Sequence, residues 1–93
     1  MGGCRRVAQL IIGCQYYYTY VLRSVKDGAL YIGWTNDLRS RLNKHNKGLV
    51  RATKMRTPFE IVYFEACLSK VSAIKREKSL KTGFGRKYLK NRI

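Results

Sequence analysis

Apolar and polar positions change their spacing several times along this chain, and each change marks an expected element. Residues 16–24, YYYTYVLRS, are aromatic and β-branched, a composition typical of a strand. Residues 30–35, LYIGWT, predict a second strand, and the turn sequence KDG at 26–28 predicts that the two form an antiparallel hairpin. From residue 16 onward the pattern therefore begins with two paired strands.

A helix is expected directly after this hairpin. Residues 35–37, TND, offer an N-cap and a first-turn carboxylate, and a glycine supplies a stop near 46–48. Leu38, Leu42 and His45 fall at positions i, i+4 and i+7, so they share one face. The pattern predicts a helix of about ten residues that packs this face against the sheet.

A basic loop and a third strand come next. Residues 47–58, KGLVRATKMRTP, carry four cations and no acid. Residues 59–68, FEIVYFEACL, predict a strand with little clean alternation, which indicates burial on both faces.

The remaining sequence predicts helices. Ser69 is expected to cap a helix that runs through Lys81, and Gly83 and Gly85 are expected to break it before a short terminal helix at 86–93. The order is β-β-α-β-α, so we predict one α+β domain over residues 16–93, with a small three-stranded antiparallel sheet flanked by helices. Residues 1–15 are expected to be a poorly ordered N-terminal extension.

The net charge of the chain indicates an anionic binding partner. Twenty Lys and Arg against five Asp and Glu give a net charge of +15 in 93 residues, an excess that an anionic partner would relieve. The basic residues lie within the expected elements, so we predict a folded basic surface that binds nucleic acid.

Cysteine usage and hydropathy bear on the compartment. The three cysteines form no C-x-x-C pair, which argues against a disulfide framework and a thiolate zinc site and favours a reducing cytoplasm. No apolar run approaches the ~18 residues that span a bilayer, so no membrane partner is expected.

Glu77 is the one acid of its expected helix. At about 100° per residue its side chain points to about 240° from Val71, whereas the apolar residues of the helix average about 250°: Val71, Ala73, Ile74 and Leu80. A lone inward carboxylate is costly unless it is paired or binds a cation. The alternatives are a structural ion pair with an arginine of the first helix and a ligand for Mg²⁺ or Mn²⁺.

Arg41 and His45 are spaced i and i+4, so they are neighbours on one flank of the first helix. The pair could converge on one phosphate. The alternative is a solvated basic face with His45 tucked against the sheet.

In an antiparallel hairpin, the residue numbers of every directly paired couple add up to the same sum. Tyr20 and Tyr31 lie on one face of the hairpin only if that sum is odd. A tight turn at Asp27 and Gly28 gives a sum of 55 and separates them by about 13 Å, at ~3.3 Å per residue. A longer loop with a sum near 51 would bring them together, so one shared site requires a turn that is not the tight one.

The region from Tyr16 to Lys81 resembles the GIY-YIG nuclease domain, especially its small single-domain bacterial branch. The second signature triplet stands as Tyr31-Ile32-Gly33, and the first as Tyr18-Thr19-Tyr20, with the family's Gly replaced by Tyr18. The stretches TNDLRSRLNKHNKG and AIKREKSLKTG are similar to the family's two helix motifs. They place Arg41 at the catalytic Arg, His45 at the following His and Glu77 at the metal-binding Glu.

The resemblance implies a metal-dependent endonuclease that hydrolyses phosphodiester bonds in DNA, with repair or recombination as its setting. It implies one Mg²⁺ or Mn²⁺ on Glu77, charge stabilisation by Arg41, and His45 as a proton relay or phosphate contact. Tyr20 or Tyr31 is expected to act as general base or water positioner, its phenolate stabilised by neighbouring cations.

Two other readings stay open: a non-catalytic nucleic-acid-binding module on the same scaffold, and a structural protein of a ribonucleoprotein. DNA is the expected partner, RNA is not excluded, and a protein partner could supply specificity. In each case exposed cations are expected to follow the phosphate backbone: Lys44, Lys47, Arg51, Lys54 and Arg56.

Overall fold

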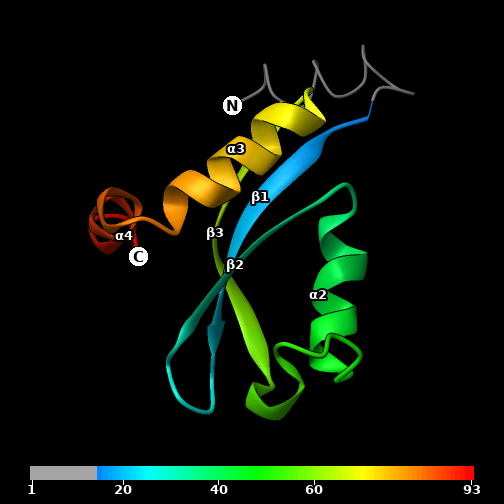
Figure 1. The fold of residues 1–93 in the computed structure, drawn as a ribbon. Helices are drawn as coiled ribbons and strands as arrows, with labels where there is room; N and C mark the ends of the chain where they lie inside the picture. The colour runs from blue at the N-terminus through cyan, green and yellow to red at the C-terminus, as the bar shows by residue number, and fades with distance from the viewer. Residues whose placement is uncertain (1–14) are drawn as a thin grey trace, which may run out of the picture.

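A three-stranded antiparallel sheet lies between helix α2 on one face and helices α3 and α4 on the other (Figure 1). The computed structural model describes residues 15–93. Its elements are β1 (Tyr17–Ser24), β2 (Leu30–Thr35), α2 (Leu38–Asn46), the 3₁₀ turn η1 (Lys54–Arg56), β3 (Phe59–Cys67), α3 (Lys70–Leu80) and α4 (Gly83–Lys90). The predicted α+β class and the element order are confirmed.

The predicted extension at residues 1–15 lies outside the described residues except for Gln15, whose amide donates to the carbonyl of Asn36 (2.9 Å). Within residues 15–93, no helix has the length and apolar character that a membrane span requires.

The hairpin register places the two candidate tyrosines on one face. Tyr20 pairs with Gly33 and Leu22 pairs with Tyr31, so paired numbers sum to 53, and a five-residue loop connects the strands. Tyr20 and Tyr31 are therefore diagonal neighbours, with ring centroids 6.4 Å apart. The sum of 53 lies between the expected alternatives of 51 and 55, and the loop is longer than the tight two-residue turn, as a shared site requires.

The strand order is β2-β1-β3, so β1 is central. The expectation that residues 59–68 are buried on both faces is wrong: β3 is an edge strand, and Phe64 is half exposed. The doubly buried strand is β1, where Thr19, Tyr20 and Val21 are fully buried. Its position between two strands and two helical layers explains this burial.

Each face of the sheet has its own core. Tyr20, Leu22 and Phe59 form one cluster, against which α2 packs Leu38 and Leu42, as its i, i+4 spacing predicts. On the opposite face a second cluster joins β1 to α3 and α4 through Val21, Leu80 and Leu89. The two helical layers are thus anchored independently to β1.

Side chains cap α2 and α3 within the predicted stretches, although the carboxylate of Asp37 is the cap of α2 itself and the first turn of α2 has no acid. Asp37 accepts from the Ser40 amide (3.1 Å) at the start of α2, and Ser69 accepts from the Ser72 amide (3.2 Å) at the start of α3. Gly48 has a φ of +75° just beyond α2, a left-handed conformation that glycine adopts without strain.

The role expected of the two glycines near the C-terminus is wrong. Gly83 and Gly85 lie in the first turn of α4, and the break after α3 falls at residues 81–82. Thr82 caps α4 by accepting from the Gly85 amide (3.2 Å). The backbone of Ser79 and Leu80 occupies the space that a Cβ on Gly85 would need, so this glycine allows the two helices to meet closely.

Candidate active site

Two side chains of α2 contact the hydroxyl of Tyr20, which extends from β1. Arg41 Nε donates to Tyr20 Oη at 3.3 Å, and His45 Nε2 lies 3.1 Å from the same oxygen. The sequence therefore correctly places Arg41 and His45 on one flank of α2, but they converge on a phenol of the protein itself.

Gly33 makes this arrangement possible. It lies opposite Tyr20 in the hairpin, and a Cβ at this position would stand 2.6 Å from Tyr20 Oη and 2.8 Å from Cζ. With no side chain on Gly33, the Tyr20 ring extends over β2 toward Tyr31. The Tyr31 ring in turn packs against His45, with centroids 5.0 Å apart.

His45 is fully buried, so the expected contact between this side chain and a substrate phosphate is wrong. An i, i+4 spacing fixes which flank a residue occupies but not its depth, and the rings of Tyr20, Tyr31 and Phe59 surround this imidazole. The alternative of a histidine tucked against the sheet is correct for His45.

Thr53 completes the surroundings of His45. Its Oγ1 lies 2.7 Å from His45 Nδ1 and donates to the carbonyl of Val50 (3.4 Å). In the tautomer that carries the ring proton on Nδ1, His45 donates to Thr53. Nε2 is then free to accept the proton of Tyr20, whose oxygen already accepts from Arg41.

The pKa of His45 supports this neutral form. Burial, assisted by the charge of Arg41, lowers it from 6.5 to about 4. His45 is therefore uncharged at neutral pH, and its Nε2, 3.1 Å from Tyr20 Oη, holds the phenol in place.

Tyr20 does not behave as the expected stabilised phenolate. Burial raises its pKa above the ordinary value of 10.0; the hydrogen bond and charge of Arg41 oppose this increase, and the charges of Tyr31 and Glu77 add to it. The side chain is only 1% exposed, whereas Tyr31 is half-buried. Tyr31 is therefore the phenol that solvent and a substrate can reach.

Glu77 faces inward, as its helical angle predicts. Its side chain is 17% exposed, and its charge acts on the pKa of Tyr20. The prediction is right although one of its premises is wrong, since Val71 is exposed.

The expected ion pair between Glu77 and an arginine of the first helix is not formed. Glu77 Oε2 instead accepts from Lys81 Nζ one turn later in the chain, at 3.2 Å.

Of the described side chains, Glu77 is the one carboxylate at the candidate site that could contribute to holding the expected divalent cation. Among residues 15–93 no three His, Cys, Asp or Glu side chains gather into a metal-binding group. Magnesium is commonly held by one or two carboxylates together with waters and substrate phosphates, so one carboxylate suffices. Lys81 supplies the positive charge beside Glu77 that such a cation would supply.

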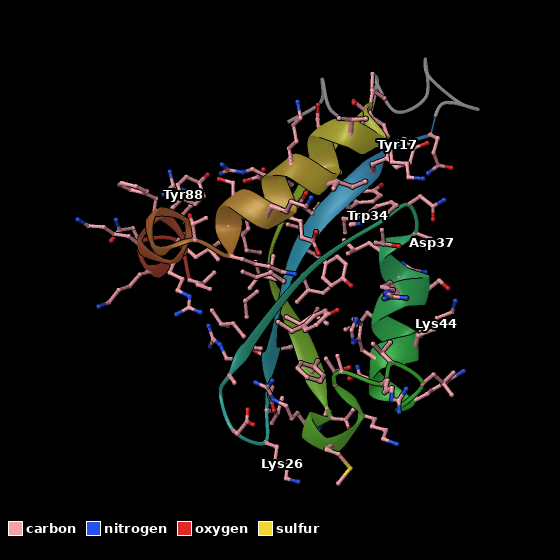
Figure 2. The ribbon with its side chains drawn as sticks, in the orientation of Figure 1. Tyr17, Lys26, Trp34, Asp37, Lys44 and Tyr88 are labelled. Atoms are coloured by element: carbon pink, nitrogen blue, oxygen red, sulfur yellow. The ribbon has the colours of Figure 1, made fainter. Side chains whose placement is uncertain are left out.

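The expected phosphate-binding cations differ in their surroundings. Lys44, Lys47, Arg51 and Lys54 are exposed, and Lys44 points from α2 away from the sheet (Figure 2). Arg56 is different because its Nε donates to Asp27 Oδ2 at 3.2 Å. That ion pair ties the hairpin loop to η1, so Arg56 has a structural partner.

Comparison with known proteins places these features in a family. A model of the GIY-YIG catalytic domain matches residues 16–90. A UPF0213 protein of Staphylococcus saprophyticus is 41% identical over 75 residues, which are 80% of this chain and 90% of that protein. A UPF0213 protein of Staphylococcus epidermidis is 40% identical over 67 residues, 71% of this chain and 80% of its own.

The chain is also similar to a solved structure, the solution NMR structure of the UPF0213 protein BH0048 from Bacillus halodurans. The identity is 33%, the TM-score is 0.50, and the match covers 82% of this chain and 83% of that one.

Proposed function

Because this chain belongs to the GIY-YIG nuclease family, we propose that it is a divalent-metal-dependent endonuclease that hydrolyses phosphodiester bonds in DNA, in repair or recombination. The observation that carries the proposal is the grouping of Tyr20, Arg41 and the inward Glu77 in a protein with four times as many cations as acids.

The accessible groups of the site act on the substrate. Arg41 uses Nε to hold Tyr20, and its two Nη groups can donate to phosphate oxygens and stabilise the charge that develops there. Tyr31 orients the attacking water, because it is the more exposed of the two phenols. Glu77 would hold the divalent cation, which would supply positive charge for the phosphate and acidify a water.

The buried groups are positioning residues. His45 and Thr53 fix the direction of the Tyr20 hydrogen bond, and Tyr20 in turn fixes the guanidinium of Arg41. This support matters because a misplacement of about 1 Å can cost about 10²-fold in rate.

The test is nicking of supercoiled DNA with Mg²⁺ or Mn²⁺, alongside an RNA substrate of matched length. We expect the wild type to nick DNA and Glu77→Gln to lose about 100-fold or more. Glu60→Gln, at an exposed acid of β3, is the matched control and keeps its activity. Absence of nicking by the wild type, or equal nicking by Glu77→Gln, rejects the proposal.

One observation favours a non-catalytic binding module instead. Lys81 already satisfies Glu77 without a metal. In that case salt-sensitive DNA binding would persist unchanged in Glu77→Gln and Arg41→Gln, with no cleavage by any form of the protein.

A further inference from the structure

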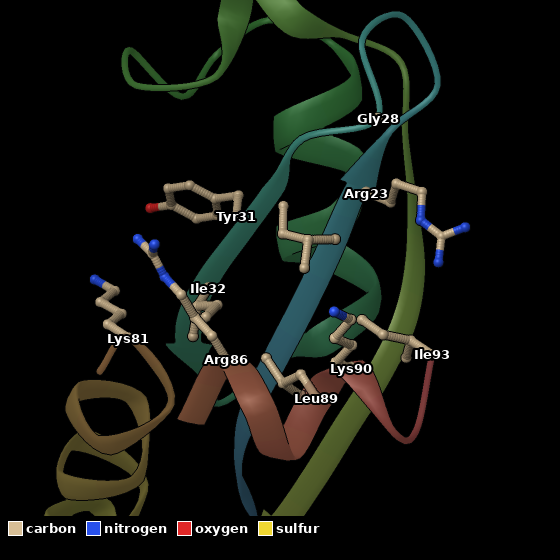
Figure 3. Close-up of a pocket in the computed structure, with 10 residues that line it drawn as sticks. Arg23, Gly28, Tyr31, Ile32, Lys81, Arg86, Leu89, Lys90 and Ile93 are labelled. Carbon is tan, nitrogen blue, oxygen red and sulfur yellow. The ribbon is translucent and has the colours of Figure 1, made fainter. Parts of the chain in front are cut away.

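A hollow of about 750 Å³ lies between the β1–β2 hairpin and α4, and we call it the α4 hollow (Figure 3). Four cations line it, Arg23, Lys81, Arg86 and Lys90, and no acidic side chain does. Figure 3 shows Lys81 and Arg86 on the side of Tyr31, and Arg23 and Lys90 on the other. The rim therefore attracts an anion from two sides.

The floor of the α4 hollow is apolar. Leu30, Ile32 and Leu89 line it, and Leu30 is 42% exposed although it belongs to a strand. Exposed aliphatic surface under a cationic rim suits a ligand with a flat apolar part and a negative part. The volume of the α4 hollow lies within the range of about 300–1,000 Å³ found for ligand pockets.

The α4 hollow adjoins the candidate active site through two shared residues. Tyr31 lines the hollow and packs its ring against His45. Lys81 lines the hollow and pairs with Glu77. A ligand in the hollow would therefore lie next to a phosphate held by Arg41 and a cation on Glu77.

A second hollow of about 400 Å³ lies at the opposite end of β2. Trp34, Arg41 and Lys70 line it, and Lys70 Nζ lies 5.4 Å from the centroid of the Trp34 ring. Because Arg41 also binds Tyr20, the candidate active site lies between the two hollows. A strand that follows β2 would pass both of them.

A nucleotide has the chemistry that the α4 hollow requires. Its base can stack on aliphatic and guanidinium surfaces, and its phosphate can bind the rim. In a continuous duplex the base faces are stacked and unavailable, so only an unpaired or extruded nucleotide can enter such a pocket.

We propose that the α4 hollow binds one unstacked nucleotide of the substrate strand, next to the phosphate that is cut. The inference rests on the proposed function for the position of that phosphate. The substrate would then be DNA that is unpaired at the cut, such as a single strand, a gap or a branch point.

The test measures oligonucleotide binding without divalent metal, so that it does not depend on cleavage. The probes are a labelled 20-nucleotide single strand, its duplex, and the same single strand with abasic spacers. The variants are Leu30→Gln in the floor and Arg86→Gln in the rim, both at exposed positions. Val25→Gln, in the exposed hairpin loop, and Lys87→Gln, on α4 outside the hollow, are the matched controls.

We expect Leu30→Gln and Arg86→Gln to weaken single-strand binding by about five- to tenfold and duplex binding by less than twofold. The controls change neither, and the abasic strand binds the wild type as weakly as the intact strand binds the variants. Equal losses on single strand and duplex, no loss, or full affinity for the abasic strand would overturn the inference. In those cases nicking by the wild type would still support the proposed function. Failed nicking together with a selective loss of single-strand binding would reject the proposed function and the position next to a cut phosphate, and would retain the nucleotide site in the α4 hollow.

Discussion

Gly33 shows how one missing side chain shapes the site. The phenol of Tyr20 occupies the space above this glycine, and Arg41 and His45 hold it there from the other side. The last residue of the family's second triplet thus has a steric role in this protein.

Gly33→Ala should force the Tyr20 ring away from Arg41, since the new Cβ would stand 2.6 Å from Tyr20 Oη. Crowding of this kind costs about 1–3 kcal/mol, so urea denaturation should show a loss of that size and nicking should fall about tenfold. Tyr20→Phe removes the atom nearest to the new Cβ, so the double variant should be less destabilised than the sum of the single variants. Strict additivity would contradict the steric explanation.

His45 makes stability depend on pH in a defined direction. Its folded pKa of about 4 is below the ordinary 6.5, so the unfolded chain binds this proton more readily. The contribution is complete above pH 6.5 and is lost as pH falls toward 4, with a total of about 3 kcal/mol. His45→Gln should flatten the free energy of unfolding over this window in urea titrations. Parallel curves for both proteins would refute this assignment.

The sequence predicts which flank of a helix a side chain occupies better than it predicts the depth of that side chain. The shared flank of Arg41 and His45 and the inward angle of Glu77 follow from helical spacing, which is a local property. The contact between Thr53 and His45 depends on how the loop after α2 folds back, and nothing in the spacing of those residues indicates it. Burial of His45 and Tyr20 likewise depends on packing against distant elements.

At the scale of elements, the junction of α3 and α4 depends on a glycine inside a helix. Gly85 is buried against the backbone of Ser79 and Leu80, whereas a Cβ on Gly83, in the same turn, would meet open space. The two positions therefore form a matched pair.

Gly85→Ala should destabilise the protein by about 2 kcal/mol or more, because the two helices must separate to accept a Cβ. Gly83→Ala should instead stabilise it by about 0.5–1 kcal/mol, since alanine loses less backbone entropy in a helix. Thermal or urea unfolding of both variants measures the difference. Similar effects at the two sites would exclude close helix packing as the reason for Gly85.

The elements that the sequence predicts correctly are those whose formation depends on neighbouring residues. The hairpin strands and the caps at Asp37 and Ser69 depend on neighbouring residues and occur where predicted. The edge position of β3 is not indicated by its sequence, because strand order is set by non-local pairing. Gly83 and Gly85 do not break a helix as expected, because Thr82 caps the next helix and packing favours a glycine within it.

At the scale of the whole molecule, a charge of +15 predicts strongly salt-dependent binding to DNA. Replacement of exposed Lys47 and Lys54 by Gln should lower the slope of log affinity against log salt by about 2, at about 0.9 per phosphate contact. Arg56→Gln should change the slope less, because Arg56 is already paired with Asp27. Titrations between about 50 and about 200 mM salt measure the slopes. An equal change for Arg56→Gln would contradict its structural role.

The contact between Lys81 and Glu77 has a thermodynamic consequence for the proposed enzyme. An incoming cation must compete with an ammonium group for the carboxylate, so the free protein should hold its metal weakly. Once displaced, that ammonium is available to a phosphate at the entrance of the α4 hollow. Metal and nucleic acid should then bind with positive cooperativity, and linkage requires that each increases the affinity of the other by the same factor.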